Sequence, residues 1–509
     1  MSAERFLAMA NADPVPRGEI PLFEIGHLRA AVLQAVEAGH RLAALFGRPA
    51  GAGEIEVLAI LADDLNGTLS AGAARVETRY PALTPGCLQA HWFERELAEQ
   101  WAVTPEGHPW LKPIRFHAPH CPRNAQQPRG AAAAPGQPGI TDYFRVEGEE
   151  VHEVAVGPVH AGIIEPGHFR FQCHGEKVFH LEIELGYQHR GIEQHLRGGP
   201  GKKTIHYMET AAGDTTVGHA TAYCHLLEAL GGVRVPARAH VLRGIALELE
   251  RLANHTGDLG ALAGDIGFLP TASFCGRIRG DWLNLTAALC GNRFGRGLVR
   301  PGGAGCDLDA PGVEQFKRRL DALERDLAGA VSLLWSVSSV MARFEETGHV
   351  SREIAEAIGL VGPAARACGI ERDVRHDFPS GIFRYSFIPL STWQSGDVFA
   401  RAFVRWTECR HSMAFIREQL ELLPGGDVAA PFDGRLEPDS LVVSMVEGWR
   451  GEICHAALTD SGGRFEQYKI VDPSFHNWFG LAMALRNQQI SDFPLCNKSF
   501  NLSYCGHDL

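Results

Sequence analysis

The sequence predicts an α+β fold organised in two domains. Strand-like segments joined by turn residues occur near the N-terminus, long amphipathic helices dominate the stretch from 215 to 422, and short strands return towards the C-terminus. Helical and strand segments therefore occupy separate stretches of the chain, which is typical of α+β proteins. With 509 residues, the chain is also too long for one small hydrophobic core.

The first 122 residues are expected to form a small α+β domain, 1–122. Apolar residues at helical spacing over 30–47 predict a helix. The segments 54–64 and 68–80 are predicted to be strands, because Asn66–Gly67 between them is a dipeptide typical of hairpin turns.

A segment rich in Pro, Gly, Ala and Gln, 123–141, is expected to be a linker because it has no apolar periodicity. The large domain, 142–509, is expected to begin with strands up to about residue 190, to continue as a helical bundle, and to close with strands. Leucines and valines repeat at intervals of three and four through its third helix. The helices are expected at 215–230, 237–262, 313–344 and 398–422.

Composition excludes several classes of function. The formal net charge is −12 and no run of Lys and Arg occurs, which argues against nucleic acid as a partner. No secretory leader is expected, and no window approaches the roughly 18 to 20 apolar residues of a membrane-spanning helix. The 12 cysteines include no C-x-x-C pair, the spacing on which zinc and iron–sulfur sites commonly rely. Reduced thiols in a cytoplasmic core are therefore expected.

No nucleotide-binding loop, G-x-S-x-G or H-E-x-x-H motif is present. Polar residues worth considering as a site lie in four segments of the large domain, and most such residues are simply hydrogen-bonded within a core. Arg251, His255 and Asp258, for example, share one face of a predicted helix, where a local salt-bridged cluster explains them without any function. The candidates are His160, Glu165, Arg190, Asp214, His255 and Asp265.

Six motifs, in order, are similar to those of one family. They are "GPVHAGIIEPGHFRF", "GYQHRGIE", "RLANHTGDLGALAGDIGF", "RPGG", "DVRHDFPSG" and "VEGWRGE". Together they resemble the large subunit of membrane-bound [NiFe] hydrogenases of the formate-hydrogenlyase type, and equally its relative, the quinone-side large subunit of complex I. The resemblance runs from about residue 150 to the C-terminus. The segment "HWFERELAEQWAVTPEGHP" resembles the small peripheral subunit of complex I, which implies that the two are fused here.

The resemblance implies that the nickel–iron centre of the hydrogenases has been lost. In that family four cysteines, arranged as two C-x-x-C pairs, hold the metals. Aligned on the family motifs, those positions are occupied by Ala212, Thr215, Ser503 and Gly506. Alanine and glycine offer no ligand atom, and neutral hydroxyls are poor substitutes for bridging thiolates. We therefore expect no metal and no cofactor bound by this chain itself.

The resemblance also implies roles for the remaining polar residues. Glu165 matches a glutamate that passes protons in the hydrogenases, and Asp265 matches an aspartate near the quinone headgroup in complex I. His160 matches the first histidine of the family's hairpin motif. Asp214 is a new charge in the old ligand loop, for which His160, Arg190 or a water is the expected partner. Arg190 matches an arginine beside the proximal [4Fe-4S] cluster of the partner subunit, and His255 is placed with it as a cofactor-binding candidate.

The function implied is that of a large subunit in a complex-I-like membrane complex. It would dock a small [4Fe-4S] subunit and a ferredoxin-like subunit, and lie peripherally on the cytoplasmic face of the bacterial inner membrane against ion-translocating subunits. Glu165, Asp214 and Asp265 would then line a polar cavity that binds a small acceptor or passes protons. Two alternatives stay open: quinone reduction at a rebuilt headgroup site, and a structural adaptor with a vestigial cavity.

Overall fold

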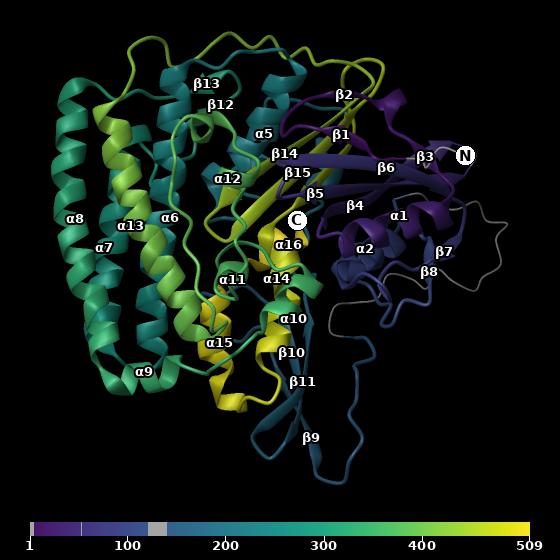
Figure 1. The fold of residues 1–509 in the computed structure, drawn as a ribbon, viewed down its shortest axis with the longest axis horizontal. Coiled ribbons are helices and arrows are strands. Elements are labelled where there is room, and N and C mark those ends of the chain that lie inside the picture. The colour runs from purple at the N-terminus through teal and green to yellow at the C-terminus, as the bar shows by residue number, and fades with distance from the viewer. Residues whose placement is uncertain (1–4, 52, 121–139) are drawn as a thin grey trace.

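The computed structural model describes residues 5–51, 53–120 and 140–509 (Figure 1). The predicted linker, 123–141, lies outside the described residues apart from its last two positions. Helices and sheets both contribute heavily, which is compatible with the α+β prediction. The N-terminal unit lies to the right in Figure 1, and a bundle of long helices lies to the left.

A five-stranded sheet forms the centre of the N-terminal unit, with β1, β6, β5 and β4 in order and β3 parallel to β6. The predicted hairpin is confirmed, because β5 and β6 pair antiparallel on either side of the Asn66–Gly67 turn. The elements are β1 (Leu7–Met9), β3 (Leu22–Phe23), α1 (Ile25–Glu37), β4 (Arg41–Gly51), β5 (Glu54–Asp63), β6 (Thr68–Val76), β7 (Arg79–Pro81), α2 (His91–Trp101) and β8 (Thr104–Glu106).

The single helix predicted over 30–47 is wrong in its second half. The helix ends at Glu37, Gly39 adopts a φ of 98°, and strand β4 follows from Arg41. Residues 42–46 are buried on both faces of this strand. A continuous apolar run of this kind does not reveal its period, so helix and strand could not be separated there.

The sheet of the large domain takes one strand from the N-terminal unit. Its order is β16, β15, β14 and β2, and β2 (Val15–Pro16) pairs antiparallel with the start of β14. Asn11 strengthens this junction, because its amide group donates to the carbonyl of Met445 and accepts from its N–H. The other strands are β14 (Ser440–Gly448), β15 (Gly451–Thr459) and β16 (Phe465–Val471).

Long helices pack beside this sheet as a bundle (Figure 1). The helices predicted at 215–230, 237–262 and 398–422 are confirmed with small shifts of their ends. The prediction at 313–344 is wrong as one helix, because the chain bends by 80° at Val337 between α8 and α9. The elements are α5 (Thr216–Leu230), α6 (Ala237–Asp265), α7 (Leu269–Cys290), α8 (Ala310–Ser336), α9 (Ser338–Phe344) and α13 (Val398–Glu421).

No single helix of the described residues is long and apolar enough to cross a bilayer. The bent pair α8 and α9 meets that requirement by length and composition alone. In α8, the residues that satisfy the helical repeat, from Leu320 to Leu334, are buried in the bundle.

A three-stranded antiparallel sheet, in the order β11, β10 and β9, extends from the domain at the bottom of Figure 1. The prediction that the chain closes in strands is wrong after residue 471, because three α-helices and a short 3-10 helix (Ile490–Asp492) follow β16. The first begins at Asp472–Pro473, an N-cap followed by a proline. These elements are β9 (Val151–Val156), β10 (His168–His174), β11 (Lys177–Glu184), α14 (Pro473–Ala484), α15 (Phe493–Phe500) and α16 (Tyr504–Asp508).

Short elements complete the large domain. They are α3 (Ile192–Leu196), α4 (Thr204–Met208), β12 (Val299–Arg300), β13 (Gly303–Ala304), α10 (Arg352–Ile358), α11 (Gly362–Arg366) and α12 (Val374–Asp377).

Buried charges join the N-terminal unit to the large domain. Glu96 of α2 accepts from Lys469 of β16 at 2.6 Å and also pairs with Arg115. All three side chains are almost completely buried. Glu193 also lies 3.1 Å from Lys469, so two carboxylates neutralise two cations.

We predict that Glu96→Gln destabilises the protein by about 3 to 5 kcal/mol, because it leaves a buried cation without its anion. The matched control is Glu106→Gln, which breaks the Arg79–Glu106 pair, where the side chains are 71% and 52% exposed. That change is expected to cost under about 1 kcal/mol. Thermal unfolding of both variants at one scan rate measures the difference, and equal shifts would contradict the prediction.

Candidate functional site

Helix α16 brings several of the predicted site residues together. Glu165 lies in the loop between β9 and β10, and its carboxylate accepts from the backbone N–H of Cys505 at 3.1 Å. Arg190 donates to the carbonyl of Cys505 at 3.0 Å and to two carbonyls of the loop before α5. In the same region Tyr504 and His160 are hydrogen-bonded at 3.3 Å. His160, Glu165 and Arg190 therefore surround the C-terminal segment.

The position of Gly506 has no room for a side chain. A Cβ atom there would lie 2.7 Å from Cγ and 2.8 Å from Oδ2 of Asp472, and 2.9 Å from Oγ of Ser503. Ser503 caps α16, accepting from the N–H of Gly506 at 2.9 Å. A carboxylate and a hydroxyl therefore fill the space that a ligand side chain at this position would need.

The two positions in the loop before α5 also lack a thiolate. Ala212 is fully buried. The hydroxyl of Thr215 accepts from the indole of Trp449 at 3.1 Å and donates to Asp214 at 3.2 Å. The four residues together do not fit a thiolate-bound metal centre. Across the described ranges, no group of three or more His, Cys, Asp or Glu side chains is arranged to hold a metal ion.

Cys505 is the thiol of this region, and it is poorly suited to ligation. Burial raises the pKa of Cys505 to about 11, and the carboxylate of Glu165 adds to the shift. The N–H of Gly213 donates to the sulfur, which lowers the pKa only in part. The thiol is therefore protonated at neutral pH, whereas a metal ligand must be a thiolate.

Asp214 forms an ion pair with Arg450, rather than with His160 or Arg190 as expected. The pair is bidentate, with N–O distances of 2.5 and 2.7 Å. The guanidinium of Arg450 is buried and lies over the ring of Trp449, 3.9 Å from its centroid. Burial alone would lower the pKa of Arg450. The charge of Asp214 acts in the opposite direction, and the resulting pKa lies above its usual value. Arg450 comes from the turn between β14 and β15.

A chain of hydrogen bonds runs behind Gly506 through completely buried side chains. Asp472 is 3.0 Å from Nε2 of His219, whose Nδ1 is 3.0 Å from Nε2 of His455. The phenol of Tyr468 donates to Nδ1 of His455 at 2.8 Å. Burial and the neighbouring His219 hold the pKa of His455 well below its usual value. A neutral His455 can donate through Nε2 to His219 while Nδ1 accepts from Tyr468, which directs the chain towards the carboxylate of Asp472.

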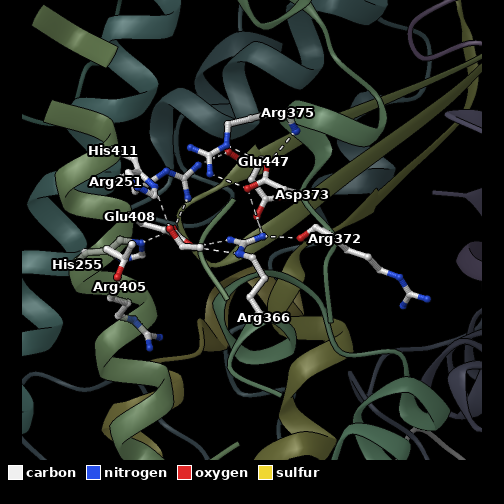
Figure 2. Close-up of polar contacts among 12 residues, drawn as sticks. Arg251, His255, Arg366, Arg372, Asp373, Arg375, Arg405, Glu408, His411 and Glu447 are labelled. Carbon is white, nitrogen blue, oxygen red and sulfur yellow. Dashed lines mark hydrogen bonds and ion pairs between the residues drawn. The ribbon is translucent and has the colours of Figure 1, made fainter. Parts of the chain in front are cut away.

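His255 lies in a buried ion cluster, where its ring nitrogens lie beside the carboxylates of Glu408 and Asp258. Figure 2 shows Arg251, Arg366 and His255 converging on Glu408 of α13. Nε2 of His255 is 2.9 Å from the carboxylate of Glu408, and Arg366 donates to the same carboxylate twice, at 2.8 and 3.0 Å. Burial lowers the pKa of His255 to about 4, against the opposing effect of Glu408. The imidazole is therefore neutral.

The cluster extends from Glu408 to the end of the central sheet. Arg366 pairs with Glu447 of β14 at 2.8 Å, and Arg375 pairs with Asp373 at 2.6 Å. Burial would raise the pKa of Asp373, but Arg375 and Arg366 hold it well below its usual range. The anions and cations are thus drawn from α6, α11, α12, α13 and β14 (Figure 2).

Asp265 stands apart from the other candidates. It lies exposed at the C-terminal end of α6, where partial burial raises its pKa and Lys498 opposes the shift. None of its hydrogen bonds or ion pairs among the described residues joins it to Glu165 or Asp214. A cavity shared by all three carboxylates thus remains a prediction from the sequence.

Several important residues of the region were missed from the sequence. Arg450 lies inside the motif "VEGWRGE", so the motif itself could have pointed to it. Asp472 has the signal of a helix N-cap before Pro473, but nothing local indicates its contact with Gly506. Glu408 has no signal, because its partners are distant in the sequence.

Comparisons with known proteins point to one class, the subunits of hydrogenase and NADH-quinone oxidoreductase complexes. The family described as "Respiratory-chain NADH dehydrogenase, 49 Kd subunit" matches residues 265–436. The carbon monoxide-induced hydrogenase of Rhodospirillum rubrum is 32% identical over 353 residues, covering 69% of this chain and 97% of the relative. NADH-quinone oxidoreductase subunit 4 of Thermus thermophilus is 30% identical over 371 residues, covering 67% and 90%.

Formate hydrogenlyase subunit 5 of Escherichia coli is 28% identical over 442 residues, covering 84% of this chain and 76% of the relative. The chain belongs to the family of complex I and hydrogenase large subunits.

We predict that Glu408→Gln lowers stability by about 3 to 5 kcal/mol, because two buried guanidinium groups lose their shared anion. The arginines hold the pKa of Glu408 well below its usual value, although burial alone would raise it. The stabilisation is therefore present above the pKa of an unfolded carboxyl and is lost as the pH falls through the folded value. Unfolding midpoints measured from neutral to acid pH should show the two proteins converging.

The control for this variant is Asp326→Asn, which breaks an ion pair with Arg277 at the exposed surface. Its effect is expected to be under about 1 kcal/mol and to fall further with added salt. A Glu408→Gln protein as stable as this control would contradict the prediction.

Proposed function

We propose that this chain is the large subunit of a membrane-bound, complex-I-like oxidoreductase complex that works without a nickel–iron centre. In this proposal it docks a small [4Fe-4S] subunit and a ferredoxin-like subunit, and it couples their electron transfer to ion translocation by membrane subunits. The complex lies on the cytoplasmic face of the bacterial inner membrane. Family membership supports the class of complex, and the motif resemblance supports the partners.

The surroundings of Gly506 carry the proposal that the metal is absent. A cysteine there would place its Cβ against the carboxylate of Asp472, which is itself held by His219 and by the N–H of Ser474 at 2.8 Å. Moving that carboxylate would break both hydrogen bonds inside the core, at a cost for each buried group left unsatisfied. The obstacle is therefore steric as well as chemical.

Arg190 supports docking of the iron–sulfur subunit. Its side chain is partly open to solvent, and three carbonyl groups of this chain fix the guanidinium. A fixed positive charge beside a cluster stabilises its reduced form, because cluster potentials depend on the charge and hydrogen bonds around the sulfurs. Three neutral acceptors leave that charge uncompensated locally.

Coupling to protons is supported by the carboxylates on either side of Cys505. Glu165 accepts from its N–H, and Asp214 follows Gly213, whose N–H donates to its sulfur. Both carboxylates are partly exposed. Carboxyl side chains are common general acids and bases in proton transfer.

Quinone reduction is the second candidate, and one contact favours it. The imidazole of His160 donates through Nδ1 to the carbonyl of Pro158, so Nε2 is free to accept from the phenol of Tyr504. When a quinone headgroup binds here, the phenol of Tyr504 can turn from Nε2 of His160 and donate to a quinone oxygen instead. In complex I a tyrosine grips the headgroup; the motif resemblance places that position near Gly213 in this chain, and Tyr504 would take its role.

The metal content of the purified complex tests the main proposal. We predict iron from the partner clusters and nickel far below one atom per complex, measured by elemental analysis. A membrane-bound [NiFe] hydrogenase purified in the same way is the positive control. One nickel per complex would overturn the proposal.

Two sets of variants separate the remaining functions, measured as turnover and ion pumping by the intact complex. Glu165→Gln with Asp214→Asn is predicted to uncouple or slow turnover by 10-fold or more, the scale of a lost proton-transfer group. Unchanged turnover and pumping would favour the structural adaptor instead.

Tyr504→Phe and His160→Gln should change the apparent affinity for quinone only if the second candidate is correct, and Tyr385→Phe, at an exposed position, serves as the control.

A further inference from the structure

Glu250 of α6 is a buried carboxylate that the proposed function does not use. Its two oxygens accept from the N–H groups of Val217 and Gly218, at 2.7 and 3.2 Å, in the first turn of α5. Among the ion pairs of the described residues, none includes Glu250. It is therefore a buried acid held by backbone amides without a cation as partner.

A small cavity connects Glu250 with Asp214 and with the molecular surface. The cavity has a volume of about 20 Å³ for the centre of a water molecule and lies between the start of α5, α6 and α7. Most of its exposed lining is apolar, but this volume is sufficient for one water, with the polar side chains of the lining as its partners. Asn254 also lines the cavity and joins the backbones of the two residues, because its amide donates to the backbone carbonyl of Asp214 at 3.0 Å and to that of Glu250 at 2.9 Å. The charged groups that line the cavity are Asp214, Glu250, Arg279 and Arg293.

We propose that Glu250 is a proton-carrying residue, which takes up a proton from solvent through this cavity and exchanges it with Asp214. The proton leaves one carboxyl oxygen and binds the other, with a water of the cavity between them, and the negative charge moves in the opposite direction. No oxidant or reductant is needed. The inference rests on the proposed function only for the destination of the proton, since the protonation of Glu250 can be tested separately.

The electrostatics of Glu250 fit such a role. Burial raises its pKa to about 8, the amides of Val217 and Gly218 oppose the shift, and the like charge of Asp214 adds to it. Arg251 lowers the pKa only slightly, because its guanidinium is committed to Glu248 and Glu408 in the ion cluster. An acid with a pKa near the working pH is the most effective donor and acceptor of protons.

The route continues towards the rest of the site. Asp214 is 35% exposed and adjoins Gly213, whose N–H donates to the sulfur of Cys505. The N–H of Cys505 in turn donates to Glu165. Glu250 therefore lies on the buried side of Asp214, one helix further from the surface, and the cavity joins the two carboxylates.

The competing explanation is that Glu250 only caps α5. The N-cap residue, Thr215, makes no capping hydrogen bond with its side chain, so Glu250 supplies acceptors from outside the helix. A cap would be most favourable as an ionised carboxylate, because the N-terminus of a helix favours negative charge. Protonation at neutral pH is thus the property that separates the two explanations.

Infrared difference spectroscopy of the purified complex between pH 6 and about 9.5 tests the inference. We expect a protonated carboxyl band that is lost with a midpoint near 8 and is absent in Glu250→Gln. Asp214→Asn should move the midpoint to lower pH, because it removes a like charge. If no band titrating in this range is lost in Glu250→Gln, Glu250 is ionised and the proposal is overturned, whatever the complex does.

Stability gives an independent readout. A carboxyl with a raised pKa in the folded state contributes stability below the pKa of the unfolded state, and that contribution is lost as the pH rises through the folded value. The wild-type unfolding temperature should therefore fall relative to that of Glu250→Gln between about pH 5 and pH 8. Parallel curves for the two proteins would count against a protonated Glu250.

Glu94 offers a matched control for the loss of a buried carboxylate that is held by backbone amides. It too is buried and accepts from two backbone N–H groups, those of Leu83 and Thr84, at 2.8 and 2.9 Å. Glu94→Gln should leave the titration of Glu250 and the turnover of the complex unchanged.

In the intact complex, Glu250→Gln should slow turnover by 10-fold or more and flatten its pH profile above neutral pH, and Glu250→Asp should restore part of the rate. Wild-type turnover and pH profile in Glu250→Gln would overturn the proton-carrying role. A wild-type complex that moves no ions would contradict the proposed function instead, and Glu250 would then be judged by the carboxyl titration alone.

Discussion

Neutralising buried charge is the constraint on which the large domain depends. Glu408 holds two guanidinium groups and an imidazole among almost completely buried side chains, where each unpaired charge would cost several kcal/mol. Its partners come from α6 and α11, and Arg366 links it in turn to Glu447 of β14 (Figure 2). These elements can approach one another only in the arrangement that pairs every charge. The cluster therefore fixes α6 and α13 against the end of the central sheet.

The position of the site follows from that arrangement. Strand β14 carries Glu447 into the cluster, and Trp449 and Arg450 come immediately after it. Once the strand end is fixed, Arg450 is directed to Asp214 and the indole of Trp449 to Thr215. The charge of Asp214 is thus neutralised by Arg450, whose position depends on the ion cluster. The C-terminal helix packs against the result, with Asp472 filling the space beside Gly506.

The sequence predicted the parts of the fold that depend on local pattern. The bundle helices have strong periodicity, and their bounds were correct within a few residues for three of the four. Residues 42–46 were misassigned because burial on both faces removes the period that distinguishes a strand. The bend at Val337 has neither proline nor glycine to announce it. The pairing of β2 with β14 joins residues far apart in the chain, which no local pattern encodes.

The residues of the candidate site could be predicted from the sequence better than the contacts that these residues make. The motifs brought His160, Glu165 and Arg190 into consideration, and the alignment of the former ligand loop added Asp214; the structure places these residues around α16. The partners of buried charges were not predictable, because they depend on which side chains meet after folding. His255 illustrates this: it lies on the predicted helix face, but its neighbour is Glu408, 153 positions away.

Strand β2 has a consequence for how the two units can exist. The edge of β14 that it covers would otherwise present free N–H and C=O groups, and exposed strand edges recruit other chains. Because the N-terminal unit is synthesised first, its strand is already available when β14 leaves the ribosome. Fusion into one chain thus supplies the cover at a ratio of one to one and in the right order. A large domain made separately would lack β2, would expose this edge of β14, and would therefore be prone to aggregation.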